Sequence, residues 1–374
     1  MPMEIELKLG LTAVQARRLA SQPLLEVVKP QTIRLFNTYY DTPDFALCQR
    51  GVALRLRRKG RSEWLMTVKG GNPAAGALAQ RSEWEVPTQP GVFDFDCIDD
   101  VSLRDYLKSL QPDLRAVFST DFTRTLWTLP WSEAVVEVAL DRGKISRPAM
   151  SGEKEVASTS ICELELELVS GDSPDALFEL AIDLAADIHL HPVVASKAER
   201  GYALARGGVG MPVKTAVPAL RRGMSPCEAF REIALSCLLQ LQRNEAGAVV
   251  GEDPEFVHLV RVAIRRLRSA FRLFSPVLAP AFIEVYAPRW KALSRQLADA
   301  REWDVILSDT VIPLAQDFPG DSEIVALREW GTVRRAQARA VAGKALKGRD
   351  YSRLVLAFAA ALYRSAPPTI DSDA

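Results

Sequence analysis

The fold of the N-terminal half is decided by the segment Met3-Glu4-Ile5-Glu6-Leu7-Lys8-Leu9. Its charged and apolar residues alternate, so Glu4, Glu6 and Lys8 project from one face of a strand and the apolar residues between them project from the other. On a strand, side chains two residues apart lie about 6–7 Å from each other, a spacing at which two carboxylates can share a metal ion. The segment predicts a strand with all its charges on one face.

The same alternation recurs along residues 3–170. The charged faces of the later segments carry Arg55 and Arg57; Lys69; Arg81, Glu83 and Glu85; Glu137 and Asp141; and Glu163, Glu165 and Glu167. Lys59-Gly60-Arg61-Ser62 predicts the turn of a hairpin between two of these strands. Helices are expected near residues 103–110 and 174–187, where the apolar residues follow a helical period.

These charged faces are unusual for strands exposed to water, which normally mix Thr, Ser, Lys and Gln. One interpretation is a solvated outer face with cross-strand ion pairs. Because several strands share the pattern, we favour a closed antiparallel barrel whose charges point into its lumen. Burying both signs of charge is costly unless the lumen holds water and a charged ligand. The pattern therefore predicts a bound polyanion together with metal ions.

The composition fits two modules of opposite charge. Residues 1–206 contain 24 Lys and Arg against 29 Asp and Glu, and residues 207–374 contain 23 against 18. With three histidines and five scattered cysteines in the chain, carboxylates are the expected metal ligands and Mg²⁺ or Mn²⁺ the expected ion. No apolar run approaches the roughly 18 residues that span a bilayer, and the N-terminus lacks the apolar stretch of a signal peptide. We expect a cytoplasmic protein without a membrane partner.

A linker is predicted at residues 206–222, which are rich in Gly and Pro, and the chain after it has a helical pattern. Ser225-Pro226-Cys227-Glu228 is typical of a helix start, with Ser at the N-cap, Pro in the first turn and Glu at the capping-box position. The predicted fold class is α+β: a closed antiparallel β-barrel with flanking helices at residues 1–205, followed by an all-α helical-bundle domain at residues 223–374.

The helical half contains a stripe of basic side chains. At about 100° per residue, its five members fall within an arc of roughly 80°: His258, Arg261, Arg265, Arg268 and Arg272. Lys291 with Arg295, and Arg335 with Arg339, repeat a basic i,i+4 spacing on later predicted helices. The alternative is a solvated helix face, but such faces usually contain some Glu to relieve repulsion, and none lies on this stripe. We expect a polyanion partner and do not expect nucleic acid.

The order of the charged positions resembles the CYTH superfamily, the triphosphate tunnel metalloenzymes. The resemblance covers residues 3–205 and is carried by Glu4-x-Glu6-x-Lys8 and by the segments 39–44, 54–57, 67–69, 118–122, 137–141, 162–167 and 196–202. It implies an eight-stranded antiparallel tunnel that cleaves or cyclises triphosphate substrates with a divalent metal.

The same resemblance implies roles for the matching residues. Phosphate oxygens would be held by Lys8, Arg55, Arg57, Lys69, Arg81, Arg124 and Lys197. Metal ligands would be Glu4, Glu6, Glu165 and Glu167, with Glu83, Glu85, Glu137, Asp141 and Glu163 as further candidates. The catalytic set would comprise Glu4, Glu6, Lys8, Glu165 and Glu167. Phosphoryl transfer depends on charge neutralisation and in-line positioning, so no Ser or Cys nucleophile is required.

Residues 257–274 resemble the signature helix of CHAD domains, helical modules in which a histidine and basic residues bind polyphosphate. Arg301-Glu302-Trp303-Asp304-Val305 resembles that family's Arg-Asp-x-Asp-Val stretch, with Glu in place of the first Asp. The family has two related halves, each with such a helix, whereas residues 223–374 contain one. We expect one half of the usual repeat, in a truncated chain or a shortened module.

Together these features predict metal-dependent hydrolysis of inorganic triphosphate to pyrophosphate and phosphate, with polyphosphate captured by the helical module. Relatives of the tunnel fold imply alternatives: a nucleoside or thiamine triphosphatase, or an adenylate cyclase. An alternative of another class is a non-catalytic polyphosphate-binding or scaffold protein. The many lumen carboxylates argue against it, because a protein that only binds polyanions does not need them. The preferred chain length, the choice of Mg²⁺ or Mn²⁺ and the oligomeric state stay open.

Overall fold

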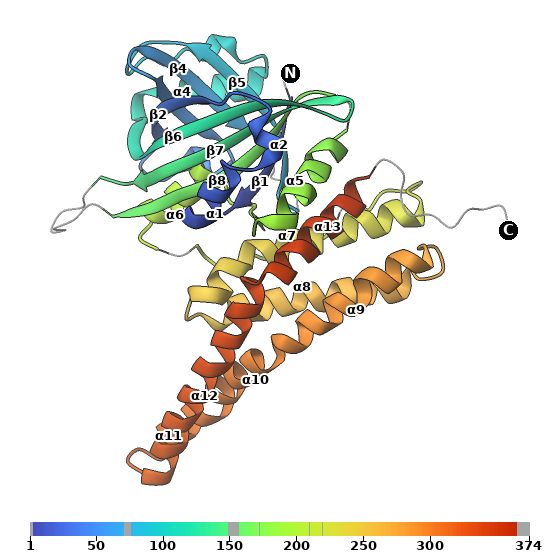
Figure 1. Ribbon diagram of the computed structural model, residues 1–374. Helices are drawn as coiled ribbons and strands as arrows, with labels where there is room; N and C mark the ends of the chain where they lie inside the picture. Colours follow the sequence, from blue (N-terminus) through green and yellow to red (C-terminus); the bar gives the residue numbers. More distant parts are fainter. Residues whose placement is uncertain are drawn as a thin grey trace. The chain divides into compact units, whose positions relative to one another are not determined.

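The computed structural model describes residues 3–70, 76–148, 157–171, 173–208, 210–218 and 220–364. It divides into two compact units, Met1–Val209 and Gly210–Ala374. The first is a β-barrel with flanking helices and the second is helical, so the predicted α+β fold is confirmed (Figure 1). Among the helices of the described residues, none combines the length and the apolar character needed to cross a membrane.

Within the described residues, eight antiparallel strands form a ring. They are β1 (Met3–Gly10), β2 (Gln31–Asp41), β3 (Ala53–Lys59), β4 (Glu63–Gly70), β5 (Leu78–Pro87), β6 (Arg115–Trp131), β7 (Ala134–Ser146) and β8 (Ser158–Ser170). The spatial order is β5-β4-β3-β2-β6-β7-β8-β1, and pairing of β5 with β1 closes the ring. A two-residue strand, β9 (His191–Pro192), extends the pairing of β1.

The strand register places the charged residues of neighbouring strands side by side. Glu167 of β8 lies opposite Glu6 of β1 and also opposite Glu137 of β7. Lys8 lies opposite Glu165. Because side chains directly opposite each other share a face of the sheet, the charged sets predicted from separate segments meet inside the barrel.

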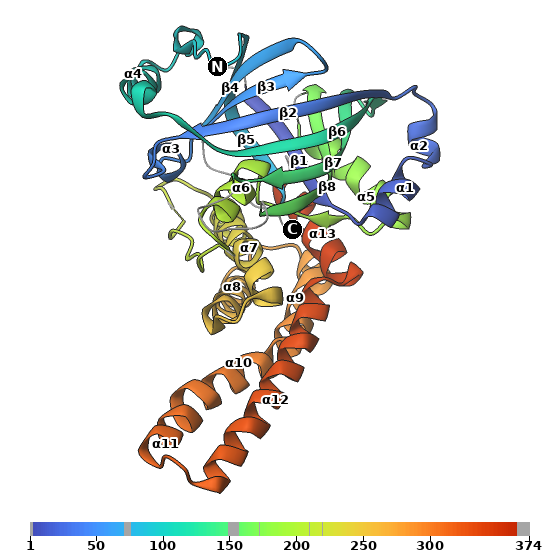
Figure 2. The same cartoon turned by 90° about the vertical axis from the view of Figure 1, so that its left-hand side faces the viewer.

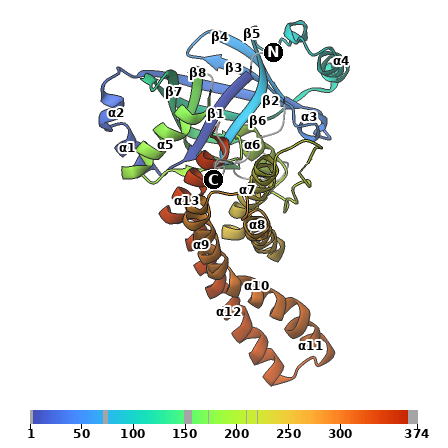
Figure 3. The same cartoon turned by 90° about the vertical axis from the view of Figure 1, so that its right-hand side faces the viewer.

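Apolar residues on the outer face of the barrel pack against short helices. Leu54 and Met66 belong to a core completed by α3 (Ala46–Gln49), α4 (Val101–Leu110) and a 3₁₀ turn at Phe95–Cys97. On another side, α5 (Asp175–Asp187) runs along β8, β1 and β7 (Figure 3). Near the start of the chain lie α1 (Ala13–Leu19) and α2 (Pro23–Glu26). The helices expected near residues 103–110 and 174–187 are thus confirmed as α4 and α5.

An aromatic cluster lies on lumen-facing positions under α6 (Lys197–Ala205). Its buried members are Leu35, Tyr39, Phe118, Phe122, Ile145, Ile161 and Tyr202. Gly201 of α6 packs so closely on Phe118 that a Cβ there would lie 2.0 Å from the ring, which explains the glycine. A capping box formed by Ser196 and Glu199 starts the helix and aims Lys197, its first residue, into the barrel.

The second unit contains α7 (Pro226–Val250), α8 (Pro254–Leu273), α9 (Pro280–Gln296), α10 (Ala298–Ile306), a π-helical turn (Leu307–Val311), α11 (Ile312–Asp317), α12 (Ser322–Leu346) and α13 (Arg349–Tyr363). The capping box predicted for Ser225 and Glu228 starts α7. α10 and α11 lie beside α12 and form a hairpin arm that projects from the rest of this unit (Figure 2).

Candidate active site in the barrel lumen

Arg55 and Arg57 of β3 face the lumen, and their nearest carboxylates lie beyond hydrogen-bond distance. The closest oxygens are at 3.5 Å and 3.8 Å for Arg55, from Glu83 and Glu85, and at 3.6 Å for Arg57, from Glu85. The Nε atom of Arg55 is buried without a hydrogen-bond partner in the described part of the chain. Burial, and then the charge of Arg55, lowers the pKa of Arg57 to about 10. Both side chains could give further hydrogen bonds to an anion in the lumen.

Two residues that were not predicted, Asn37 and Tyr39, interact with this arginine pair. Asn37 of β2 accepts a hydrogen bond of 2.9 Å from Nε of Arg57. Burial alone would raise the pKa of Tyr39, but the charges of Arg55 and Arg57 outweigh burial and lower it. Neither residue is charged, so the charge alternation that marked the other strands gave no signal for them.

The lysines of β1 and β4 are held by the carboxylates of the tunnel. Lys69 Nζ lies 2.8 Å and 2.7 Å from the two carboxylate oxygens of Glu4 and 3.0 Å from Glu83. Lys8 Nζ contacts Glu6 directly. This pairing brings the Glu-x-Glu-x-Lys segment together with β4 and β5 inside the barrel.

Four carboxylates of β1, β7 and β8 form an acid-rich group: Glu4, Glu6, Glu137 and Glu167. Burial raises the pKa of Glu167 to about 7, with contributions from the negative charges of Glu4, Glu6 and Glu137. Burial also raises the pKa of Glu4, although Lys69 opposes the shift. Raised carboxyl pKa values mark a region where negative charge exceeds positive charge. A divalent cation would relieve this excess, and carboxylate oxygens suit Mg²⁺ or Mn²⁺.

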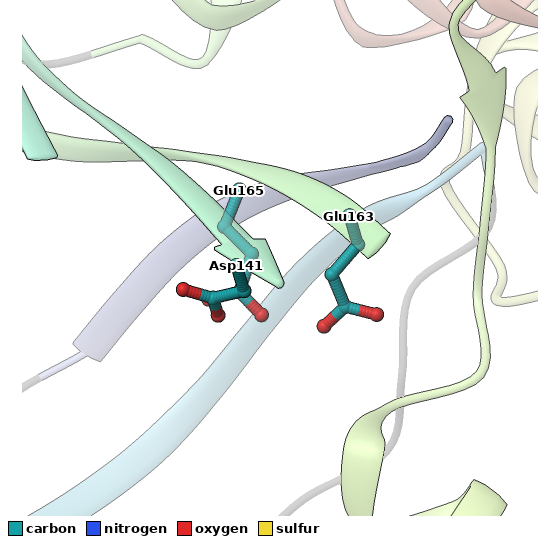
Figure 4. Close-up of side chains that lie close together, drawn as sticks. All are labelled: Asp141, Glu163 and Glu165. Carbon is teal, nitrogen blue, oxygen red and sulfur yellow. The ribbon is translucent and has the colours of Figure 1, made fainter. Parts of the chain in front are cut away.

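Three further carboxylates, Asp141, Glu163 and Glu165, form a triad on β7 and β8 (Figure 4). Each offers an oxygen within 4.8 Å of the others, a spacing that could hold a metal ion. However, Lys197 Nζ lies 2.7 Å from Asp141 and 2.9 Å from Glu165, and it also contacts Glu163. The ammonium group of α6 therefore takes the central position among these carboxylates.

Two arginines add to the positive charge around the triad. Arg124 of β6 donates to both oxygens of Asp141, at 2.8 Å and 2.7 Å, and to Glu165. Arg200 of α6 donates to Glu163 at 2.8 Å. Burial alone would raise the pKa of Glu165, but Lys197 and Arg124 outweigh burial and hold it well below its usual range. We call Asp141, Glu163 and Glu165 the neutralised triad.

The structure thus brings the predicted lumen residues together but divides them by charge balance. The acid-rich group includes Glu4 and Glu167, whose pKa values are raised, and it suits a metal ion, whereas the neutralised triad already has three cationic side chains. Glu85, about one-third exposed, accepts a 2.7 Å hydrogen bond from Thr67 and lies beside the arginine pair. The side chain of Arg81 lies outside the described residues.

The basic stripe lies on α8, where Arg265 and Arg272 are exposed and the other members are partly buried. Arg261 donates a 3.2 Å hydrogen bond to the Ser294 carbonyl of α9, next to the exposed Arg295. Lys291 is also exposed on α9. Burial, and then the charge of Arg301, lowers the pKa of His258. The stripe and the basic residues of α9 therefore belong to neighbouring helices.

Arg335 and Arg339 have a structural role that their spacing did not reveal. Both hold the fully buried Asp304 of α10, with Nε atoms at 2.7 Å and 3.0 Å from the same oxygen. They also donate to the carbonyls of Glu252 and Gly251, which precede α8. These contacts join α12 to α10 and account for the aspartate of the Arg301–Val305 stretch.

Comparisons with known proteins agree with the division of the chain into a barrel and a helical unit. The CYTH domain model matches residues 2–202, and the CHAD domain model matches residues 232–374. An inorganic triphosphatase from Haemophilus influenzae is 34% identical over 215 residues, which are 54% of this chain and 55% of that protein. The match thus spans about half the length of the curated relative.

Two solved structures are each similar to a part of the chain. A putative adenylyl cyclase from Hippeastrum, described as having a dominant triphosphatase activity, is 19% identical with a TM-score of 0.41, over 56% of this chain and 98% of that one. The CHAD domain from the plant Ricinus communis is 32% identical with a TM-score of 0.35, over 41% of this chain and 50% of that one. Since the CYTH model alone matches more than half of the residues, the chain belongs to the CYTH family, and a CHAD domain follows its barrel.

Proposed function

We propose that the barrel hydrolyses inorganic triphosphate to pyrophosphate and phosphate with Mg²⁺ or Mn²⁺, and that the helical unit binds polyphosphate. The observation that carries the proposal is the lumen itself. It combines an arginine pair, in which Nε of Arg55 has no hydrogen-bond partner among the described residues, with an acid-rich group in which the pKa values of Glu4 and Glu167 are raised. The inorganic triphosphatase of Haemophilus influenzae supports the same substrate class.

The arginine pair would bind the phosphate chain. A guanidinium group matches phosphate oxygens through two parallel hydrogen bonds, and these bonds are stronger in a buried site than in water. Lys8 and Lys69 would extend the cationic surface, since each ammonium group has three donors and borders the acid-rich group. Arg124 and Lys197, predicted as phosphate ligands, would act mainly by holding the neutralised triad and α6 in place.

The metal would be held by the acid-rich group, with Glu83 next to it. The residues fit such an ion because the folded barrel already raises the pKa of Glu167 to about 7, and a cation would replace the proton. When bound, the ion would neutralise phosphate charge and acidify a water molecule. Asp141, Glu163 and Glu165 are weaker candidates, because Lys197 lies among them.

The helical unit would bind longer polyphosphate through the stripe on α8 and the exposed Lys291 and Arg295 of α9. Such binding would be electrostatic and would weaken with salt, because each phosphate that the protein neutralises releases counterions. Arg265 and Arg272 of the stripe are exposed and could reach such a ligand, and the hydrogen bond from Arg261 to the Ser294 carbonyl joins α8 to α9.

A phosphate-release panel tests the barrel proposal. The full chain would be assayed on tripolyphosphate, ATP, thiamine triphosphate and long polyphosphate, with and without metal. We expect the fastest turnover on tripolyphosphate and none without metal. Glu4→Gln and Glu6→Gln should abolish turnover, while the exposed Glu63→Gln of β4 should not. Faster turnover of ATP or thiamine triphosphate would instead support the other triphosphatases, and no turnover of any substrate would support a binding protein.

A further inference from the structure

Helix α12 of the arm has one face whose side chains are all exposed. We call it the α12 stripe, and its members follow a spacing of three and four residues: Glu323, Ala326, Leu327, Trp330, Val333, Arg334, Gln337, Ala340, Val341 and Lys344. Its large apolar side chains keep much of their surface in water, from 41% for Leu327 to 55% for Trp330 and 58% for Val341. A repeat of this spacing over 22 residues is typical of a helix that packs against another helix.

The opposite side of α12 is already used within the arm. Gly331 packs on Leu307, where a Cβ would lie 3.0 Å from the leucine side chain, and Arg335 and Arg339 hold Asp304. Most of the α12 stripe therefore points away from α10 and the π-helical turn. Trp330 lies at its border, where its ring meets the Trp303 ring of α10 edge to face at a centroid distance of 5.2 Å. The guanidinium carbon of Arg334 lies 5.9 Å from the centre of the Trp330 ring and 6.0 Å from the centre of the Trp303 ring.

The residues of the stripe are arranged so that the stripe is complementary to itself when it is reversed. With a two-fold axis between Val333 and Arg334, Glu323 would face a basic residue of a second, antiparallel copy. Leu327 and Val341 would each face an alanine of that copy. The facing pairs would be Glu323 with Lys344, Ala326 with Val341, Leu327 with Ala340, Trp330 with Gln337, and, beside the axis, Val333 with Arg334. The apolar contacts alternate large with small side chains, and one ion pair forms at each end. We infer that the α12 stripe binds the α12 stripe of a second copy of this chain, antiparallel and two-fold symmetric.

Charge and geometry favour a second copy of this chain as the partner, and an antiparallel arrangement of the two helices. A parallel pair would place Glu323 and Lys344 against their own copies, and like charges facing each other are unfavourable. A two-fold interface needs a self-complementary patch, because residue i contacts j and residue j contacts i. At 1.5 Å per residue the stripe is about 33 Å long, and a specific interface must bury on the order of 1,000 Å² in total. A single helix pair lies near that limit, so we expect a concentration-dependent equilibrium between monomer and dimer.

Sedimentation equilibrium of the full chain, combined with charge reversal, tests the pairing. Glu323→Lys and Lys344→Glu each turn two attractive end pairs into repulsive ones, and each should raise the dimer dissociation constant roughly tenfold. The double variant restores opposite charges across the interface and should return the constant to within about threefold of the wild type. The matched control is Glu284→Lys, at an exposed position of α9, which should change nothing. Circular dichroism would verify that every variant is folded.

Thiol crosslinking locates the symmetry axis. Val333→Cys places one thiol from each copy beside the axis, so a short bismaleimide should join two chains efficiently. Val285→Cys on α9 is the matched control, with 44% of the valine exposed, and should crosslink no more than the wild type. A monomer at all concentrations would overturn the inference. So would a double variant that dimerises no better than the single ones, or equal crosslinking at positions 333 and 285.

Discussion

Replacement of Lys197 by Met removes the ammonium group from the centre of the neutralised triad and keeps most of the apolar stem. Lys197 is 7% exposed, Asp141 is fully buried and Glu165 is 9% exposed, so water cannot replace the lost charge. Arg124 and Arg200 would remain, but neither contacts all three carboxylates. The variant would leave buried negative charge without its main partner.

The expected cost is large for a single substitution. Removal of one partner from a buried ion pair destabilises a protein by about 3–5 kcal/mol, because the remaining charge stays buried and unpaired. The matched variant Lys144→Met lies at an exposed position of the same strand, β7, and should change stability by no more than about 0.5 kcal/mol.

The loss of stability in Lys197→Met should also depend on pH. Without Lys197, the main charge that offsets burial at Glu165 is lost, and we expect the pKa of Glu165 to be higher in the folded chain than in the unfolded chain. The folded variant would then bind more protons than the unfolded variant, so its stability would increase as the pH falls. We expect the difference between the variant and the wild type to be large at pH 8 and to narrow towards pH 5.

Hydrogen exchange measured by mass spectrometry reports this change locally, because peptides from β7, β8 and α6 are read separately from the helical unit. In Lys197→Met the free energy of opening of the amides in these peptides should be lower than in the wild type. The amides of α7 to α13 should keep their protection. If the amides of β8 are equally protected from exchange in Lys197→Met and Lys144→Met at pH 8, Lys197 does not neutralise the triad. The assignment of the metal to the acid-rich group then loses its basis.

Three further predictions concern the ligands. Because burial raises the pKa of Glu167 to about 7, the affinity for Mn²⁺ measured by calorimetry should fall about tenfold from pH 8 to pH 6. For the same reason, the free energy of unfolding of the metal-free chain should fall as the pH rises through about 7. Glu167→Gln should remove both effects, and an affinity that is equal at both pH values would contradict the assignment. Arg55→Ala and Arg57→Ala should each raise the KM for tripolyphosphate at least about tenfold or abolish turnover, since a charge-assisted hydrogen bond contributes about 1.5–3 kcal/mol; unchanged steady-state kinetics would place both residues outside the site. The double reversal of Arg261 and Arg265 to Glu should remove salt-sensitive polyphosphate binding and leave tripolyphosphate hydrolysis intact, and wild-type binding that does not respond to salt would refute the role of the stripe.

The strands with charged lumen faces could be predicted from the sequence, because a period of two is visible wherever Glu, Arg or Lys alternates with apolar residues. This holds for β1, β3, β4, β5, β7 and β8. Strands β2 and β6 gave no such signal in their pattern. Their lumen faces carry Asn37, Tyr39, Phe118 and Thr120, which mix polar and aromatic residues, and only the resemblance to the CYTH superfamily marked those segments.

The candidate site was predicted as a set of residues but not as a charge distribution. Which carboxylate faces which cation depends on the register between strands far apart in sequence, such as Glu167 beside Glu137, and on where α6 directs Lys197. The sequence therefore treated all lumen acids alike as candidate metal ligands. Likewise, the spacing of Arg335 and Arg339 suggested a basic surface, whereas both arginines hold the buried Asp304.

The central claim is that the lumen hydrolyses inorganic triphosphate with a divalent metal, and phosphorus-31 NMR tests it most directly. Tripolyphosphate incubated with the full chain and Mg²⁺ or Mn²⁺ should be converted to equal amounts of pyrophosphate and phosphate. No conversion is expected when the metal is chelated, or when Glu4→Gln replaces the wild type under the same conditions. Tripolyphosphate that stays intact with metal, or is consumed equally by the Glu4→Gln variant, would contradict the account.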